Sequence, residues 1–278
     1  MSNKAFMPLL LFFIHFSCVN IFAQVEPNTN NIEAPKRWIR ENVRFFETDA
    51  LGRIWVVDQK NQIHLYDENG IKKYSFADNR LGQITSIDVS NPLKALIFYG
   101  DFGIIRFLDN TLTEVEQIKL QDSGKFFNVA AAALSNDNNI WIYDIQWQRI
   151  YKINSTFEIL RETNVFNDLG LGGFKPFKMA EKANLLVAGS KENGFVIFDN
   201  FGQMKKQISV ADLRDFQFEG TKILCLLSNT MMIQALDPPN PFKLPLPQGL
   251  NASDVLQIRL TSKRWYLAYA DGIDWFAK

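Results

Sequence analysis

Four aspartates occupy the same place in a repeated pattern of this 278-residue sequence, each after a short apolar run and before a polar turn. If the turns share one face of the fold, four carboxylates repel one another there, and Ca²⁺ or a cationic ligand would relieve the repulsion. We favour a local role, because aspartate accepts hydrogen bonds from its own turn. The pattern therefore predicts no cofactor and leaves Ca²⁺ as the alternative. The four residues are Asp58, Asp101, Asp144 and Asp271.

Aromatic side chains in two of these turns have no local structural reason to be there. Phe102 lies in GDFG and Trp147 in DIQWQR, and Phe126 and Phe127 in the nearby segment DSGKFF are candidates for the same exposed apolar patch. Exposed aromatics bind partners or stack on sugars, although they also fold back over a core. The predicted partner- or ligand-binding face comprises Asp58, Asp101, Phe102, Asp144, Trp147 and Asp271.

Three acidic residues stand on the predicted inner strands near the central tunnel, and they are the candidates for a metal site. Asp88, Glu181 and Asp215 would have to meet in space, and the metal remains unknown. Ion pairing with Arg259 or Arg214 is the structural interpretation that we favour, since a buried charge normally has a partner.

Histidine and nucleophile chemistry find little support in the sequence. His64 is the only histidine beyond residue 15, which excludes a histidine-rich metal site, and its strand setting favours a half-buried packing role. A Ser-His-Asp arrangement would require a serine and an aspartate to meet that one histidine. We therefore predict no catalytic residues and regard an enzyme as the less favoured class.

The elements that must position these residues come from a sixfold repeat. Two apolar runs joined by a turn recur with first positions 54, 96, 140, 185, 223 and 265, so the steps are 42, 44, 45, 38 and 42. This period is typical of propeller blades. A barrel or a pair of sandwiches explains the steps less well, and the sequence predicts an all-β, six-bladed β-propeller.

Each repeat has two further strand candidates, which makes four per blade. An inner strand precedes the pair, as in RFFETD, and a polar outer strand follows it, as in KKYSF. The sixth repeat ends at Lys278 without an outer strand, whereas PKRWIREN (35–42) stands alone before the first. We expect this N-terminal segment to close the ring as the missing outer strand.

The phrase GRIWVVD (52–58) resembles the turn-into-strand phrase of bacterial six-bladed propellers of the NHL and gluconolactonase-like kind. That resemblance implies a propeller, and in the enzymes among them a divalent metal held in the central tunnel. Their Glu, Asn and Asp ligand set cannot be placed on this sequence residue by residue. WD-type repeats fit less well, because no Gly-His pair opens a repeat and no Trp-Asp pair closes one.

The first 23 residues have the pattern of a secretory signal peptide, with Lys4 before an apolar run that ends near Ala23. We expect cleavage between Ala23 and Gln24, a linker over 24–34 and one propeller domain over 35–278. Lipidation of Cys18 is the disfavoured alternative. The predicted location is the periplasm, or the cell surface in association with the outer membrane, and no segment is apolar enough for a transmembrane helix.

Charge and cysteine content narrow the class of partner. Removing residues 1–23 takes away only Lys4, which leaves 29 basic and 30 acidic residues and gives no reason to expect nucleic acid. Only Cys225 then remains, so no intramolecular disulfide can form. We predict a non-catalytic scaffold or assembly subunit that binds an envelope protein. A metal-dependent lactonase or lyase and a carbohydrate-binding propeller are the alternatives.

Two long segments complete the sequence. NVFNDLGLGGFKPF (164–177) is expected to be a flexible surface excursion, because no helix and lysine follow that would make it a phosphate loop. LDPPNPFKLPLPQG (236–249) is expected to protect a sheet edge, since proline cannot donate to a strand ladder.

Overall fold

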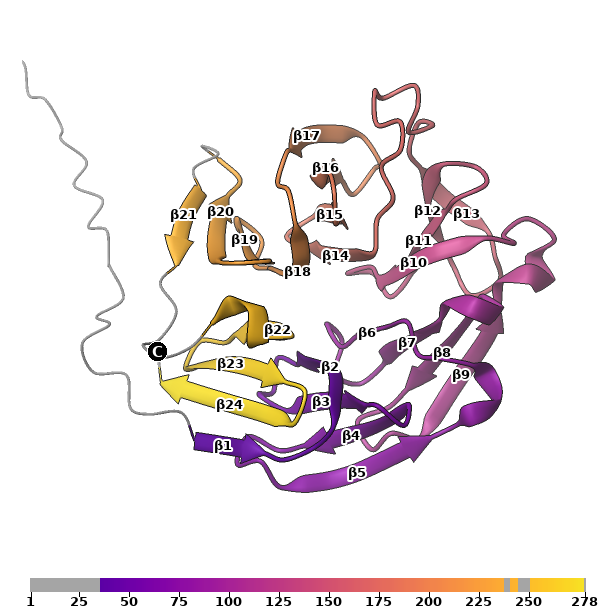
Figure 1. The fold of residues 1–278 in the computed structure, drawn as a ribbon. Coiled ribbons are helices and arrows are strands. Elements are labelled where there is room, and N and C mark those ends of the chain that lie inside the picture. The colour runs from indigo at the N-terminus through magenta and orange to yellow at the C-terminus, as the bar shows by residue number, and fades with distance from the viewer. Residues whose placement is uncertain (1–35, 238–240, 245–250, 278) are drawn as a thin grey trace, which may run out of the picture. The chain divides into compact units, whose positions relative to one another are not determined.

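The structure is a computed structural model that describes residues 36–237, 241–244 and 251–277. These residues form six antiparallel sheets of four strands each, arranged around a common centre (Figure 1). The predicted six-bladed β-propeller is thereby confirmed. In chain order the strands are β1 Lys36–Ile39, β2 Val43–Thr48, β3 Ile54–Asp58, β4 Gln62–Tyr66, β5 Lys72–Ala77, β6 Ser86–Asp88, β7 Ala95–Tyr99, β8 Ile104–Leu108, β9 Glu114–Lys119, β10 Val129–Leu134, β11 Ile140–Asp144, β12 Arg149–Ile153, β13 Ile159–Glu162, β14 Lys178–Lys182, β15 Leu185–Ser190, β16 Gly194–Asp199, β17 Met204–Ile208, β18 Leu213–Phe218, β19 Lys222–Leu227, β20 Met231–Ala235, β21 Pro241–Leu244, β22 Gln257–Leu260, β23 Arg264–Tyr269 and β24 Gly272–Ala277.

Blades one to five each use four consecutive strands, beginning with β2, β6, β10, β14 and β18 at the centre. The second and third strands are buried almost throughout, as in β3 and β11, because neighbouring blades cover both of their faces. Outer strands such as β5 are largely exposed and carry lysine. Short 3-10 turns lie in the links and turns at Asn79–Leu81, Gly100–Phe102, Leu120–Ser123 and Ala252–Asp254.

The hydrophobic core is divided among the junctions between blades. Within the described residues it consists of six clusters, and each cluster joins side chains of two neighbouring blades. Burial between blades is the main stabilising term available to a chain with a single described cysteine, which is unpaired.

The N-terminal strand closes the ring as the sequence predicts. β1 pairs antiparallel with β24, with Lys36 opposite Trp275 and Ile39 opposite Ile273, so blade six has the order β1-β24-β23-β22. The Trp38 indole donates a hydrogen bond to the carbonyl of Asn69 at 3.0 Å and packs on Tyr266 with ring centroids 5.8 Å apart. Trp38 thus fixes the closing strand to blades one and six together.

Trp38→Ala tests this closure. We expect the substitution to lower the free energy of unfolding by about 2 kcal/mol, less than for a fully buried tryptophan, because the ring is half-buried. Denaturant unfolding would measure it. Trp147→Ala is the matched control, since that ring is half-exposed and lies away from the closure. An equal loss in both variants would contradict a special role for Trp38.

The link between blades three and four packs into the core. Phe166, Leu171 and Phe174 are buried in the cluster between these blades, so the prediction that the link is a surface excursion is wrong. The apolar residues spaced between its glycines attach the link to the core. The proline-rich segment supplies β21, which pairs with β20 at the sheet edge.

Two predictions about the N-terminal segment fall outside the described residues: the signal peptide 1–23 with its alternative anchor at Cys18, and the linker 24–34. Among the described residues, no helix is long and apolar enough to cross a membrane.

Candidate functional site

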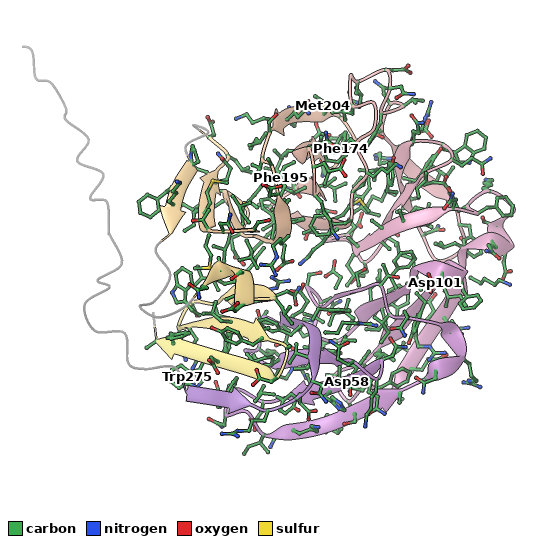
Figure 2. All side chains as sticks on the ribbon, viewed as in Figure 1. Asp58, Asp101, Phe174, Phe195, Met204 and Trp275 are labelled. Carbon is green, nitrogen blue, oxygen red and sulfur yellow. The ribbon has the colours of Figure 1, made fainter. Side chains whose placement is uncertain are left out.

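The candidate site lies on the face that carries the turns between second and third strands. Successive strands in a blade are antiparallel, so these turns share a face with the links that lead from one blade to the next. We call it the turn face. Figure 2 labels two of its predicted residues, Asp58 on blade one and Asp101 on blade two.

Two of the four predicted aspartates are buried and bind their own turns. The Asp58 carboxylate accepts hydrogen bonds from the backbone N–H groups of Lys60 at 2.9 Å and Gln62 at 2.8 Å. Asp144 accepts from Gln146 at 2.8 Å and Trp147 at 3.1 Å. This is the local role that the sequence analysis favours, and it orients the turn that presents Trp147.

The other two aspartates, Asp101 and Asp271, are exposed on separate blades, blade two and blade six. The structure therefore does not bring the four carboxylates into one group. In residues 36–237, 241–244 and 251–277, no set of three or more His, Cys, Asp or Glu side chains is placed to hold a metal ion.

Three exposed aromatic side chains on the turn face form what we call the aromatic patch: Phe102, Phe127 and Trp147, with exposed fractions of 49%, 57% and 51%. The prediction that Phe126 belongs with them is wrong. Phe126 is 1% exposed and packs on Tyr151 in the core between blades two and three. The adjacent Phe127 lies at a bend of the chain and is exposed instead.

Backbone contacts hold the three parts of the patch together. The turn of Phe102 is joined to the link 120–128 by the bond from Leu120 N–H to the carbonyl of Gly103, at 2.8 Å. In the same link, the Lys125 carbonyl accepts a hydrogen bond from the Trp147 indole at 3.2 Å. The Asn128 carbonyl accepts one from the N–H group of Ile145 at 2.9 Å. The patch therefore spans the junction of blades two and three on a fixed backbone.

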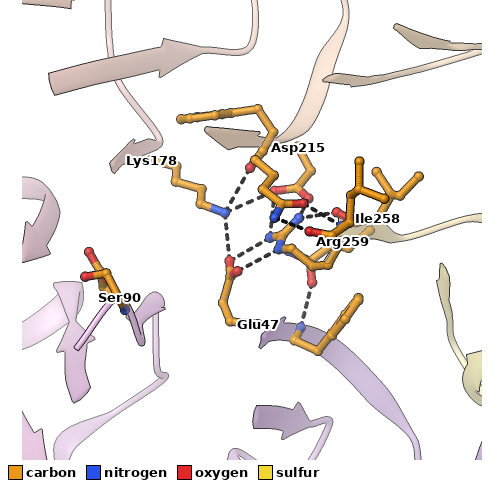
Figure 3. Close-up of polar contacts among 12 residues, drawn as sticks. Glu47, Ser90, Lys178, Asp215, Ile258 and Arg259 are labelled. Carbon is orange, nitrogen blue, oxygen red and sulfur yellow. Dashed lines mark hydrogen bonds and ion pairs between the residues drawn. The ribbon is translucent and has the colours of Figure 1, made fainter. Parts of the chain in front are cut away.

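The acids near the centre of the ring form a different kind of site, shown in Figure 3. Arg259 on β22 is 1% exposed and binds Glu47 on β2 through two nitrogens, each at 2.6 Å. It also forms a short ion pair with Asp215 on β18. Lys178 on β14 contacts Glu47 at 2.7 Å and Asp215 at 3.5 Å. We call these four residues the tunnel cluster; its formal charges sum to zero.

The tunnel cluster connects blades one, four, five and six. The contact between Lys178 and Glu47 joins blades one and four, which lie opposite each other in the ring. Burial raises the pKa of Asp215, but the nearby Arg259 and Lys178 charges outweigh it, so the net pKa is lowered. The balance is the same for Glu47. Both carboxylates are held ionised by cations of the chain itself.

Asp88 and Glu181, the other metal candidates, have separate partners. Asp88 accepts backbone hydrogen bonds from Ser90 at 2.9 Å and Leu134 at 2.8 Å, and burial raises its pKa. Glu181 accepts from the hydroxyl of Ser135 at 2.6 Å and from the indole of Trp141. None of the three candidates therefore shares its hydrogen bonds with another.

The pairing of Asp215 with Arg259 agrees with the ion pairing predicted from the sequence, whereas Glu47 and Lys178 were not among the predicted site residues. Both stand in inner strands, in RFFETD and FKMAEK, and a charge at such a position is the signal that could have found them. His64, expected to be half-buried, is only 5% exposed and has two polar partners.

Comparisons with known proteins bear on the fold. A scan against protein-family models finds no match, and a search of the curated proteins finds none either. Among solved structures, the chain is similar to the Pan2 WD40 domain of Neurospora crassa, with a TM-score of 0.62 and 11% identity over 85% of this chain and 89% of that one. It is also similar to the extracellular domain of a candidate one-component system from B. thetaiotaomicron, with a TM-score of 0.57 and 11% identity over 88% of this chain and 40% of that one.

BamB from Moraxella catarrhalis matches with a TM-score of 0.46 and 14% identity, over 81% of this chain and 70% of that one. The finer resemblance to NHL and gluconolactonase-like propellers is not confirmed and stays a prediction. The likeness to a WD40 domain is one of fold, since the sequence lacks the Gly-His and Trp-Asp pairs of WD-type repeats. At these identities the comparisons show the architecture alone, and the chain is a six-bladed β-propeller.

Proposed function

We propose that this protein is an exported β-propeller of the cell envelope that acts as a protein-binding scaffold or assembly subunit, and that it binds its partner through the turn face. The aromatic patch carries the proposal. Three large rings, each about half-exposed, lie over one junction between blades on hydrogen-bonded backbone. Tryptophan and other aromatic side chains are enriched among the residues that dominate binding energy at protein interfaces.

The tunnel cluster supports a scaffold over tunnel chemistry. Its four charged groups satisfy one another across the ring, so the acids that could serve as ligands are already paired. Removing a carboxylate from such a pairing leaves a buried cation uncompensated, which is costly. The turn face offers exposed apolar area without that cost.

Affinity purification of the tagged protein from native envelopes, followed by mass spectrometry, tests the proposal. We expect a stoichiometric partner with the wild type, and binding at least about 30-fold weaker with Trp147→Ala, which corresponds to roughly 2 kcal/mol at a binding hot spot. Phe201→Ala is the matched control, because that ring is 59% exposed in a turn on the opposite face. Equal retention of the partner by both variants, or no partner at all, would contradict the proposal.

The same sample tests the predicted export and the processing of the N-terminus. A mature N-terminus at Gln24 would support export with cleavage after Ala23, and a lipid-modified Cys18 would support the alternative anchor. An intact Met1 in the envelope fraction would argue against export through a cleaved signal.

A further inference from the structure

His64 connects an aspartate and a serine on blade one. Its Nδ1 atom lies 2.9 Å from the hydroxyl oxygen of Ser75, and its Nε2 atom lies 3.2 Å from Oδ2 of Asp58. His64 and Ser75 are directly opposite each other in the pairing of β4 with β5. The sheet register therefore fixes the contact, and the end of β3 supplies the carboxylate.

The hydrogen bonds around Asp58 determine which ring nitrogen carries the proton. Oδ1 of Asp58 already accepts from two backbone N–H groups. A carboxylate oxygen is an acceptor, so Nε2 of His64 donates its hydrogen to Oδ2. In that tautomer Nδ1 has a free lone pair and accepts a hydrogen bond from the Ser75 hydroxyl.

The serine is accessible although the histidine is not. Ser75 is exposed on β5, the outermost strand of its sheet, whereas His64 is 5% exposed. Because β5 pairs on one side only within the described structure, alternate backbone N–H groups along its free edge face outward. Such groups can donate to an oxyanion that forms beside the serine.

We propose that Ser75 is an activated nucleophile that reacts with acyl and phosphonyl donors, with His64 as its general base and Asp58 as the residue that orients the base. This activity goes beyond the proposed scaffold function and uses none of the three residues of the aromatic patch. The relation among the three groups is the one required of a nucleophile, a base and an orienting acid.

The same transfer step applies to acyl donors and to phosphonyl donors. The Ser75 oxygen attacks the acyl carbon or the phosphorus, and its proton passes to Nδ1 of His64. The new bond to oxygen forms as the bond to the leaving group breaks. An alcohol leaving group takes the proton back from His64, whereas fluoride leaves as the anion and His64 then gives its proton to water. The transient imidazolium is paired with the Asp58 carboxylate at Nε2.

A fluorophosphonate probe on the purified, folded protein tests the proposal. Trypsin releases residues 74–80, YSFADNR, so fragmentation of that peptide locates the adduct. We expect one adduct, on Ser75, formed at least about 100-fold faster than on Ser155 or Ser209, which are exposed but have no histidine partner among the described residues. Labelling of Ser75 no faster than of those serines, or labelling of Tyr74 instead, would overturn the proposal.

Variants distinguish loss of the general base from loss of folding. Ser75→Ala should abolish the adduct, and His64→Gln should slow its formation about 100-fold while the circular dichroism spectrum stays unchanged. The comparison among serines within the wild type holds even if His64→Gln fails to fold. Trp147→Ala should label like the wild type, so loss of partner binding and loss of labelling are independent outcomes.

Discussion

Replacing Arg259 by methionine is expected to lower the free energy of unfolding by about 3–5 kcal/mol, the usual cost of removing one partner from a buried ion pair. The guanidinium binds Glu47 through two nitrogens and also pairs with Asp215. After the substitution, Lys178 alone faces the buried Asp215 carboxylate and the partly buried Glu47 carboxylate. Methionine keeps most of the side-chain volume, so the loss reports uncompensated charge more than a cavity.

Unfolding in urea at neutral pH, followed by tryptophan fluorescence, measures this loss. Arg149→Met is the matched control, because Arg149 pairs with Glu162 at 2.9 Å where both side chains are substantially exposed. We expect that variant to lose less than about 1 kcal/mol. Equal midpoints for Arg259→Met and the wild type would show that the tunnel cluster does not hold the blades together.

A quadruple variant shows whether Arg259→Met is destabilised by the charges left unpaired or by the loss of a favourable ion pair. Converting the whole tunnel cluster, as Glu47→Leu, Lys178→Met, Asp215→Leu and Arg259→Met, removes every charge at once. We expect it to be more stable than Arg259→Met alone, since buried ion pairs replaced entirely by apolar residues are often neutral or stabilising. If the quadruple variant were the less stable of the two, specific pairing would be the source of stability.

The fold could be predicted because its determinants are local and repeated. Each blade carries the same succession of apolar runs and polar turns, so a strand that is ambiguous in one repeat can be placed by comparison with the other five. The strand candidate PKRWIREN belongs to no repeat, which leaves ring closure as its place, and β1 pairs there with β24. Capping by Asp58 and Asp144 also depends only on neighbours in the chain.

Contacts between distant positions could not be read in the same way. Glu47 and Lys178 are 131 residues apart, and nothing in either strand specifies the other. Phe126 and Phe127 differ only in which side of the chain faces the core, and a shift of one residue exchanges those sides. The meeting of His64 with Ser75 depends on the register of β4 against β5, which the polar sequence of β5 does not fix.

Acid is expected to destabilise the protein, and the direction follows from three carboxyl groups whose pKa is lowered in the folded state. A hydrogen bond from Arg80 is the main cause of the lowered pKa of Asp78. For Glu47 and Asp215, burial raises the pKa but the Arg259 and Lys178 charges lower it further. A pKa lower in the folded than in the unfolded state contributes stability that is complete above the unfolded value and is lost as the pH falls.

The protein therefore begins to lose stability as the pH falls below the ordinary pKa values of 4.5 for glutamate and 3.8 for aspartate. The free energy of unfolding continues to fall until the pH reaches the lower pKa values of the folded state. Asp88 acts in the opposite direction, because its pKa is raised, but it is one group against three. We expect the free energy of unfolding, measured with urea, to be constant between pH 7 and about pH 5 and to fall by several kcal/mol by about pH 3. Arg259→Met should show a shallower fall, because it lacks the charge that keeps Glu47 and Asp215 ionised. A wild type as stable at pH 3 as at pH 7 would mean that the tunnel cluster does not stabilise its carboxylates.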